Sequence, residues 1–195
     1  MKALTHLAEV SNVLHDVSAT AKALVASLSA EQMVRRPEPN AWSVAECLAH
    51  LTITANAYAP VWRDTFAAAK HKAARGREPY RMDFMGRMLN WSLEPGRFRH
   101  KTPAHMQPIE VTSGDVALAD FLDSQSMVQQ CLIEGTGLPL DRMKIASPAV
   151  ASIHYSVWSS FVIVATHDRR HLLQAERVAT RQTPRSRPTS APTRW

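Results

Sequence analysis

Cysteine is scarce in this chain of 195 residues, which has only Cys47 and Cys131, far apart in the sequence. A disulfide framework needs several cysteines and a thiolate zinc site needs close pairs such as Cys-x-x-Cys, so neither is indicated. Long apolar runs are also missing, and the first ten residues carry polar side chains where a signal peptide needs an apolar stretch. We therefore expect a cytoplasmic protein with no membrane partner.

Acidic residues are absent from the last 15 residues, 181–195, which contain four arginines and are rich in proline, serine and threonine. Removing these four charges lowers the formal net charge of the chain from +6 to +2. A segment with so little to bury is expected to be a disordered basic tail. Such a tail gives at most weak, salt-sensitive attraction to nucleic acid, so we expect no specific nucleic-acid partner.

Apolar residues recur at steps of three, four and seven along most of the remaining chain, which is the pattern of amphipathic helices. Ser43 and Glu46 form a capping-box pattern at the start of the second helix, Ser113 is a plausible cap for the third, and Ser147-Pro148 is expected to open the last. Pro60 should kink the second helix. The helices are expected at about 3–28, 43–72, 113–135 and from 147 onward, with a short helix at 83–92.

No alternation typical of strands stands out, so the predicted fold is all-α: four main helices around one core. A long crossover, residues 75–114, lies between the second and third helices and is broken by several prolines. We expect one domain, a helical bundle over residues 1–180, followed by the tail 181–195.

A pair of histidines in the last helix is the strongest chemical signal. His167 and His171 lie four residues apart and continue its apolar face. Residues at this spacing have Cβ atoms roughly 5–6 Å apart, so two imidazoles can bind one metal ion. His50, at the edge of the inward-facing stripe of the second helix, is a candidate third ligand. Three protein ligands and an open position are typical of catalytic zinc sites, whereas hydrogen bonds can also satisfy buried histidines.

Two other metal sites fit poorly. Asp168 follows His167 where the zincin motif has glutamate, but it is short and precedes two arginines, so a surface position or a contact with Arg169 or Arg170 is expected instead. A di-iron carboxylate site needs two Glu-x-x-His pairs, and the sequence has none.

Two segments resemble the DinB-like (YfiT-like) superfamily of metal-associated helical proteins. In residues 39–51, Trp42 and Ser43 precede the helix that carries His50, and in residues 167–176 the two histidines are followed by Gln174. The resemblance spans about residues 3–180. It implies a four-helix bundle with up-down-down-up topology and a divalent metal ion, often nickel or zinc, held by His50, His167 and His171.

Relatives of this kind include transferases and isomerases that use a low-molecular-weight thiol, such as bacillithiol, mycothiol or glutathione. Membership of a fold family does not fix the reaction. We expect a small-molecule substrate, and thiol-dependent S-transfer is the first hypothesis, because a thiol that coordinates a metal loses its proton. Arg87, Arg97 and Arg99 in the crossover could bind carboxylates of the thiol.

Two alternatives stay open. Metal-dependent hydrolysis would use the ion to acidify a bound water and would need a general base, for which the sequence offers only Glu46 or Asp168. The bundle could also be a non-enzymatic metal-stabilised scaffold or a dimerisation module, forming a homodimer. Trp42, Trp62 and Trp158 are expected to pack in the core or in a pocket wall.

Overall fold

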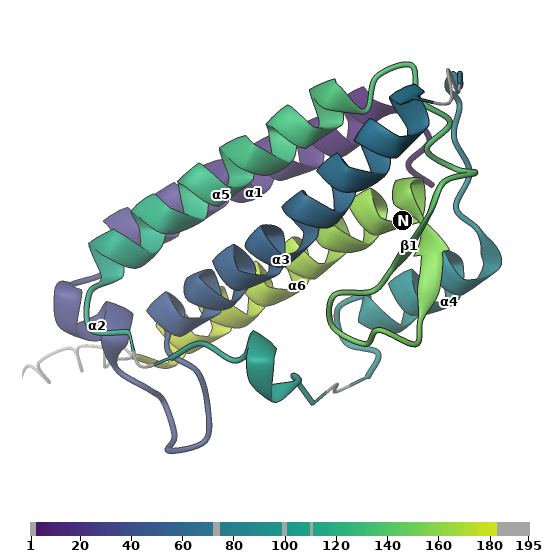
Figure 1. Ribbon diagram of the computed structural model, residues 1–195. Coiled ribbons are helices and arrows are strands. Elements are labelled where there is room, and N and C mark those ends of the chain that lie inside the picture. Colours follow the sequence, from purple (N-terminus) through teal and green to yellow (C-terminus); the bar gives the residue numbers. More distant parts are fainter. Residues whose placement is uncertain (1–2, 72–74, 99–100, 110, 183–195) are drawn as a thin grey trace, which may run out of the picture.

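A computed structural model describes residues 3–71, 75–98, 101–109 and 111–182 (Figure 1). Its main helices are α1 (Leu7–Ala26), α3 (Val44–His71), α5 (Gly114–Glu134) and α6 (Val157–Gln182). The smaller elements are α2 (Ala30–Val34), α4 (Phe84–Leu93), the 3-10 helix η1 (Ala104–Met106) and the strands β1 (Lys144–Ala146) and β2 (His154–Ser156). The all-α fold class predicted from the sequence is confirmed.

The four long helices form a bundle in which α3 packs against α5 and α6, and α1 packs against the same two helices (Figure 1). The start of α3 packs with the start of α5 but with the ends of α1 and α6. Helices α3 and α5 are therefore parallel to each other and antiparallel to α1 and α6, which is the up-down-down-up topology. The crossover between α3 and α5 returns the chain to the end at which α3 began.

The apolar core is divided into two clusters along the bundle. One contains Trp62 and Trp158, which are fully buried together with their neighbours on α3 and α6. The other contains Leu48 from the start of α3 and Phe121 from the start of α5. Between them, α3 and α6 bring buried polar residues to the interior, including His50, Thr166 and Asp168. The bundle thus has a polar layer between two apolar ends.

The start of α3 has the capping box that its sequence predicts. Ser43 Oγ accepts a hydrogen bond from the Glu46 amide at 3.1 Å, and Glu46 Oε2 accepts one from the Ser43 amide at 2.8 Å. Two otherwise unpaired amides are satisfied in this way. The helix then continues through Pro60 to His71. This cap fixes where α3 begins and hence where His50, two turns later, faces.

The last helix begins later than the sequence suggested. Ser147-Pro148 does not open a helix: the Ser147 amide donates to the Ile153 carbonyl at 2.8 Å, within the turn that joins β1 to β2. The two strands pair antiparallel, with Ile145 opposite Tyr155. Ser156 then caps α6, because its Oγ accepts from the Ser159 amide at 3.1 Å. The expectations of no strand and of a helix from Pro148 were therefore wrong.

The crossover is held against the start of α6 by one carboxylate. Asp83, which caps α4, accepts hydrogen bonds from the Gly86 amide at 2.8 Å, from the Ser156 amide at 2.8 Å and from Ser159 Oγ at 3.1 Å. Gly86 has no room for a side chain, since an added Cβ would lie 2.2 Å from Ser159 Oγ. The short helix predicted at 83–92 is present as α4. Its contact with the start of α6 fixes the position of the crossover before the chain continues to η1.

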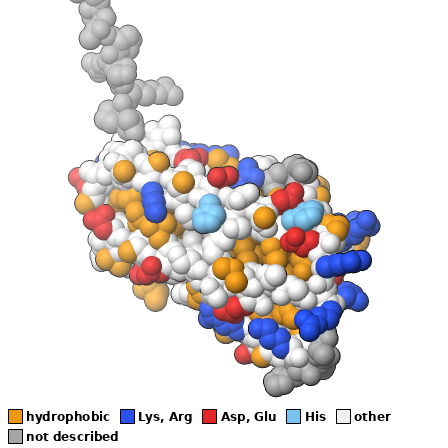
Figure 2. Space-filling model, turned by 90° about the horizontal axis from the view of Figure 1, so that it is seen from above, with side chains coloured by type: hydrophobic (Ala, Val, Ile, Leu, Met, Phe, Trp, Pro, Cys, Tyr) orange, Lys and Arg blue, Asp and Glu red, His pale blue; other side chains and the backbone are white. Residues whose placement is uncertain are grey.

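The apolar content of the helices and the distribution of surface charge both bear on membrane and nucleic-acid partners. Within the described residues, no helix combines the length and apolar content needed to cross a membrane. Figure 2, seen from above, shows Lys and Arg gathered toward the end at which α3 finishes, with Asp and Glu scattered among them. This face of the molecule therefore carries mixed charge.

The capping box yields a stability prediction. Ser43→Ala removes the acceptor for the Glu46 amide and should lower the free energy of unfolding by about 1 kcal/mol, measured by urea denaturation. Ser126→Ala is the control, because Ser126 is exposed in the middle of α5 and bonds only to the Leu122 carbonyl of its own helix. The control should change stability by less than about 0.5 kcal/mol. Equal effects of the two substitutions would contradict the role of the cap.

Candidate metal centre

Three histidines from two helices converge in the polar layer. His50 comes from α3, and His167 and His171 lie one turn apart on α6. The ring centroids of His50 and His171 are 4.5 Å apart, as are those of His167 and His171, and those of His50 and His167 are 4.9 Å apart. Each offers one ligand atom within 4.8 Å of the other two. The cluster could hold a metal ion, and the three residues are those singled out from the sequence.

Neighbouring backbone and side-chain groups orient two of the rings. His50 Nδ1 lies 2.8 Å from the Met106 carbonyl oxygen in η1, and His171 Nδ1 lies 3.0 Å from Gln174 Oε1. Both partners are acceptors, so both rings carry their proton on Nδ1 and present an unprotonated Nε2. Metal-bound histidines are oriented by this kind of outer hydrogen bond. Gln174 belongs to the sequence motif, whereas nothing in the sequence indicated the Met106 carbonyl.

The geometry between the rings fits a shared cation. His50 Nε2 and His167 Nε2 are 3.1 Å apart. Two nitrogens bound to one tetrahedral zinc at about 2.0–2.1 Å are about 3.3–3.4 Å apart, so only a small adjustment is needed. His167 Nδ1, in addition, is buried without a hydrogen-bond partner. A buried polar atom without a partner is unusual in a native structure and requires a physical reason.

Burial keeps all three rings neutral. Loss of water around the rings lowers the pKa of His50, lowers the pKa of His171 strongly, and lowers the pKa of His167 to about 3. The other histidines and the Arg170 guanidinium lower the pKa of His167 and His171 further. Neutral imidazole is the form that binds a metal ion, so protons compete little with a cation near neutral pH.

Trp42 forms a wall beside the cluster. Its ring centroid lies 4.8 Å from that of His50 and 5.7 Å from that of His171, just before α3 begins. Trp42 is half-buried, and the side chain of His167 is 15% exposed. The cluster therefore lies near the surface of the bundle, with two of its three rings partly exposed. Trp62 and Trp158 lie in the core, so all three tryptophans are core or wall residues as expected.

Both carboxylates considered as general bases are occupied. Glu46 is 2% exposed and accepts from the Arg36 guanidinium at 2.9 and 3.0 Å and from the Ser43 amide, and its pKa is lowered although burial alone would raise it. Asp168 is 1% exposed rather than on the surface, and its Oδ2 accepts from Gln125 Nε2 at 2.9 Å. The expected surface position of Asp168 was wrong. Burial raises its pKa to about 7.

Two of the three crossover arginines considered for binding the carboxylates of a thiol lie within the described residues. Arg97 forms an ion pair with Glu94 at 2.8 Å and stacks over Trp91, Arg87 is exposed on α4, and Arg99 lies outside the described residues. The positive charge near the histidines comes from Arg170. Its guanidinium donates to the Leu93 carbonyl at 3.2 Å and to the Phe98 carbonyl, which ties α6 to the crossover.

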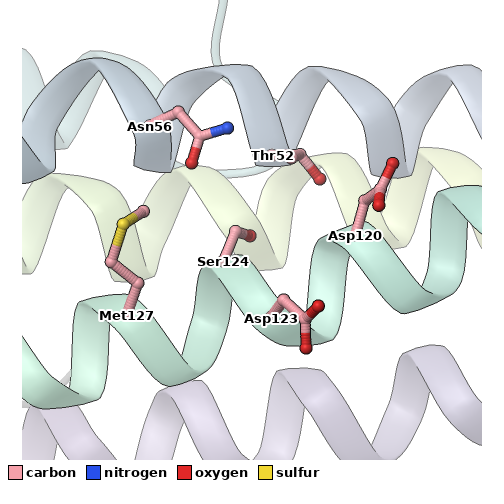
Figure 3. Close-up of a pocket in the computed structure, with 6 residues that line it drawn as sticks. All are labelled: Thr52, Asn56, Asp120, Asp123, Ser124 and Met127. Carbon is pink, nitrogen blue, oxygen red and sulfur yellow. The ribbon is translucent and has the colours of Figure 1, made fainter.

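A separate hollow of about 420 Å³ lies on the other side of α3, between α3 and α5 (Figure 3). It is lined by polar and acidic side chains together with one methionine: Thr52, Asn56, Asp120, Asp123, Ser124 and Met127. None of the three clustered histidines contributes to it. This hollow is therefore distinct from the candidate metal centre.

Comparison with known proteins gives one match. A family model described as the DinB superfamily matches residues 14–175, a stretch that contains all three histidines. No curated protein and no solved structure matches the chain.

The buried histidines make stability depend on pH when metal is absent. As the pH falls below about 6.5, His50, His167 and His171 become protonated in the unfolded chain but stay neutral in the native state. The free energy of unfolding therefore decreases as the pH falls toward 3. Asp168 has the opposite effect on the free energy of unfolding, because its native pKa of about 7 is higher than the ordinary 3.8 and the native state therefore binds the extra proton as the pH falls. The three histidines outweigh this single group.

Urea denaturation in excess chelator should therefore give a lower free energy of unfolding at pH 5.0 than at pH 7.5. Replacing His167 by Asn should make the difference smaller, whereas His15→Ala, an exposed position on α1, should leave it unchanged. A metal-free protein that is equally stable at both pH values would contradict the burial of three neutral rings.

Proposed function

The chain belongs to the DinB superfamily, and from that premise we propose that it is a divalent-metal-dependent enzyme that joins a low-molecular-weight thiol to a small electrophile. The observation that carries the proposal is the convergence of His50, His167 and His171, three neutral rings of which two are partly exposed. Three protein ligands leave a coordination position for a substrate, as in catalytic rather than structural zinc sites. Zinc and nickel both suit imidazole ligands.

A divalent ion held there would lower the pKa of a thiol that coordinates it, so that the thiol is ionised at neutral pH. In the net reaction the thiol loses its proton to solvent, its sulfur forms a bond to the electrophilic carbon, and the leaving group departs with the electron pair. The protein contributes orientation: the Met106 carbonyl and Gln174 fix two of the rings. Trp42 offers an apolar wall, and Arg170 adds positive charge that favours an anionic sulfur.

We prefer thiol transfer to hydrolysis because of where the two carboxylates that could act as a general base, those of Glu46 and Asp168, lie. Activating a water for attack is helped by a carboxylate within reach of it. Glu46 is buried and held by Arg36 and Ser43. Asp168 is buried beside His167 Nδ1, on the side of that ring away from Nε2. A thiol acidified by a metal needs no such base. The positions of these carboxylates therefore support the thiol over water as the nucleophile.

The first test is metal binding by the whole chain. Tag-free wild type should contain near-stoichiometric zinc or nickel by mass spectrometry, either as purified or after reconstitution. Zinc at 100 times its dissociation constant should stabilise the fold by about 2.7 kcal/mol, seen as a rise in the melting temperature. His171→Ala and His50→Ala should each abolish this rise, because each removes a ligand.

His15→Ala is the matched control, since it removes an exposed histidine outside the cluster. It should bind metal as the wild type does. Circular dichroism of every variant shows whether loss of metal is separate from loss of the fold. Wild type that binds no metal, or folded His171→Ala that keeps it, would refute the proposal.

The second test asks whether a thiol reaches the metal. With Co²⁺ in place of the native ion, addition of glutathione, mycothiol or bacillithiol should produce a strong near-ultraviolet absorption from sulfur bound to cobalt. The chain's own thiols do not interfere, because burial raises the pKa of Cys47 to about 12 and that of Cys131 to about 11. The same absorption should be absent in His171→Ala.

Activity then separates the alternatives. Consumption of an alkylating or epoxide electrophile only when thiol is present supports S-transfer. Ester or amide cleavage without thiol would identify a hydrolase instead. Stoichiometric metal with neither activity, and no cobalt–sulfur absorption, would leave a metal-stabilised scaffold.

A further inference from the structure

The geometry points to Asp168 as a positioning residue for the metal centre: its carboxylate accepts a hydrogen bond from the Nδ1–H group of His167 when a metal ion is bound, and Gln125 on α5 holds it in place. This inference rests on the proposed metal site. It concerns a carboxylate that neither helix pattern nor motif assigned to the interior. Asp168 is 1% exposed, and its Oδ1 lies 3.9 Å from His167 Nδ1.

His167 is the exception among the three histidines. His50 and His171 each have an acceptor at about hydrogen-bond distance from Nδ1, at 2.8 and 3.0 Å. His167 Nδ1 is equally buried but has no partner within hydrogen-bond range. His167 is therefore the one ring of the three without an outer acceptor, and the charged oxygen beside its Nδ1 is that of Asp168.

The two tautomers of His167 differ in whether its contact with His50 is favourable without a metal ion. With its proton on Nε2, the ring donates to His50 Nε2, 3.1 Å away, and the two histidines satisfy each other without a metal ion. With its proton on Nδ1, both Nε2 atoms carry lone pairs that face one another, and only a cation between them makes that arrangement favourable. Conversion loses a proton from Nε2 and gains one at Nδ1, so the number of protons on the ring does not change.

Asp168 is placed to favour the second tautomer. A shift of about 1 Å in the ring or the carboxylate brings Oδ1 within the usual hydrogen-bond distance of Nδ1. Asp168 Oδ2 meanwhile keeps its bond to Gln125 Nε2 at 2.9 Å. Gln125 is itself 3% exposed, so the contact connects α5, which supplies no ligand, to the ligand helix α6.

Substitutions at Asp168 test the inference by metal affinity and by ring tautomer. Asp168→Ala should weaken zinc binding 10–100-fold, the usual cost of losing an outer hydrogen bond to a ligand, measured by competition with a chromophoric chelator. Asp168→Asn should recover part of the loss, because its amide oxygen can accept from His167 while its NH₂ group donates to Gln125 Oε1, which is buried without a partner.

Thr166→Val is the matched control. Thr166 precedes His167 on α6, is 2% exposed, and has a hydroxyl without a hydrogen-bond partner. The substitution keeps the shape and should leave zinc affinity unchanged. Gln125→Leu keeps the Asp168 carboxylate but removes the side chain that donates a hydrogen bond to it, so it should reduce zinc affinity less than Asp168→Ala does. This variant also tests the inference if Asp168→Ala does not fold.

Long-range ¹H–¹⁵N NMR of the imidazoles supplies a readout independent of activity. In zinc-loaded wild type, His167 should carry its proton on Nδ1, and in the Asp168→Ala protein that proton should exchange faster with water. Zinc affinity of Asp168→Ala within twofold of wild type, or zinc bound to His167 through Nδ1, would overturn the inference while the metal site stands. Absence of zinc binding in wild type would instead overturn the proposed function and this inference together.

Discussion

The antiparallel packing of α3 against α6 is the constraint on which the rest of the site depends. It places a histidine from one helix opposite two from the other, in a polar layer between two apolar clusters. Burial then keeps the rings neutral, and neutral rings are what a metal ion requires. Loss of the apolar packing at either end would move His50 relative to the α6 pair, so core stability and the geometry of the histidine cluster are linked.

Around this contact, three different elements each contribute one positioning group. The crossover supplies the Met106 carbonyl to His50, the same helix turn supplies Gln174 to His171, and α5 supplies Gln125 to Asp168. The crossover is in turn tied to α6 at two places, by Asp83 near its start and by Arg170 near the histidines. A segment with little regular structure therefore acts as part of the wall of the site.

Much of this could be predicted from the sequence, because the relevant signals are local. Helical periodicity, the Ser43 cap and the four-residue spacing of His167 and His171 each act within one or two turns. The errors came from interactions that reach beyond one or two helical turns. Ser147-Pro148 has the pattern of a helix start, but pairing of β1 with β2 displaces that start to Val157. Asp168 has basic neighbours typical of a surface, yet Gln125 from another helix satisfies it inside. The role of a backbone carbonyl, such as that of Met106, does not depend on the side chain and therefore cannot be predicted from residue identity.

The central claim is that His50, His167 and His171 bind one divalent ion through Nε2 and leave a position open. A crystal structure of the zinc-loaded protein, with an anomalous difference map measured at the zinc edge, tests it most directly. We expect a single strong peak within about 2.0–2.1 Å of all three Nε2 atoms, with a fourth ligand from solvent. A peak elsewhere, or a fourth protein ligand that closes the coordination sphere, would contradict it.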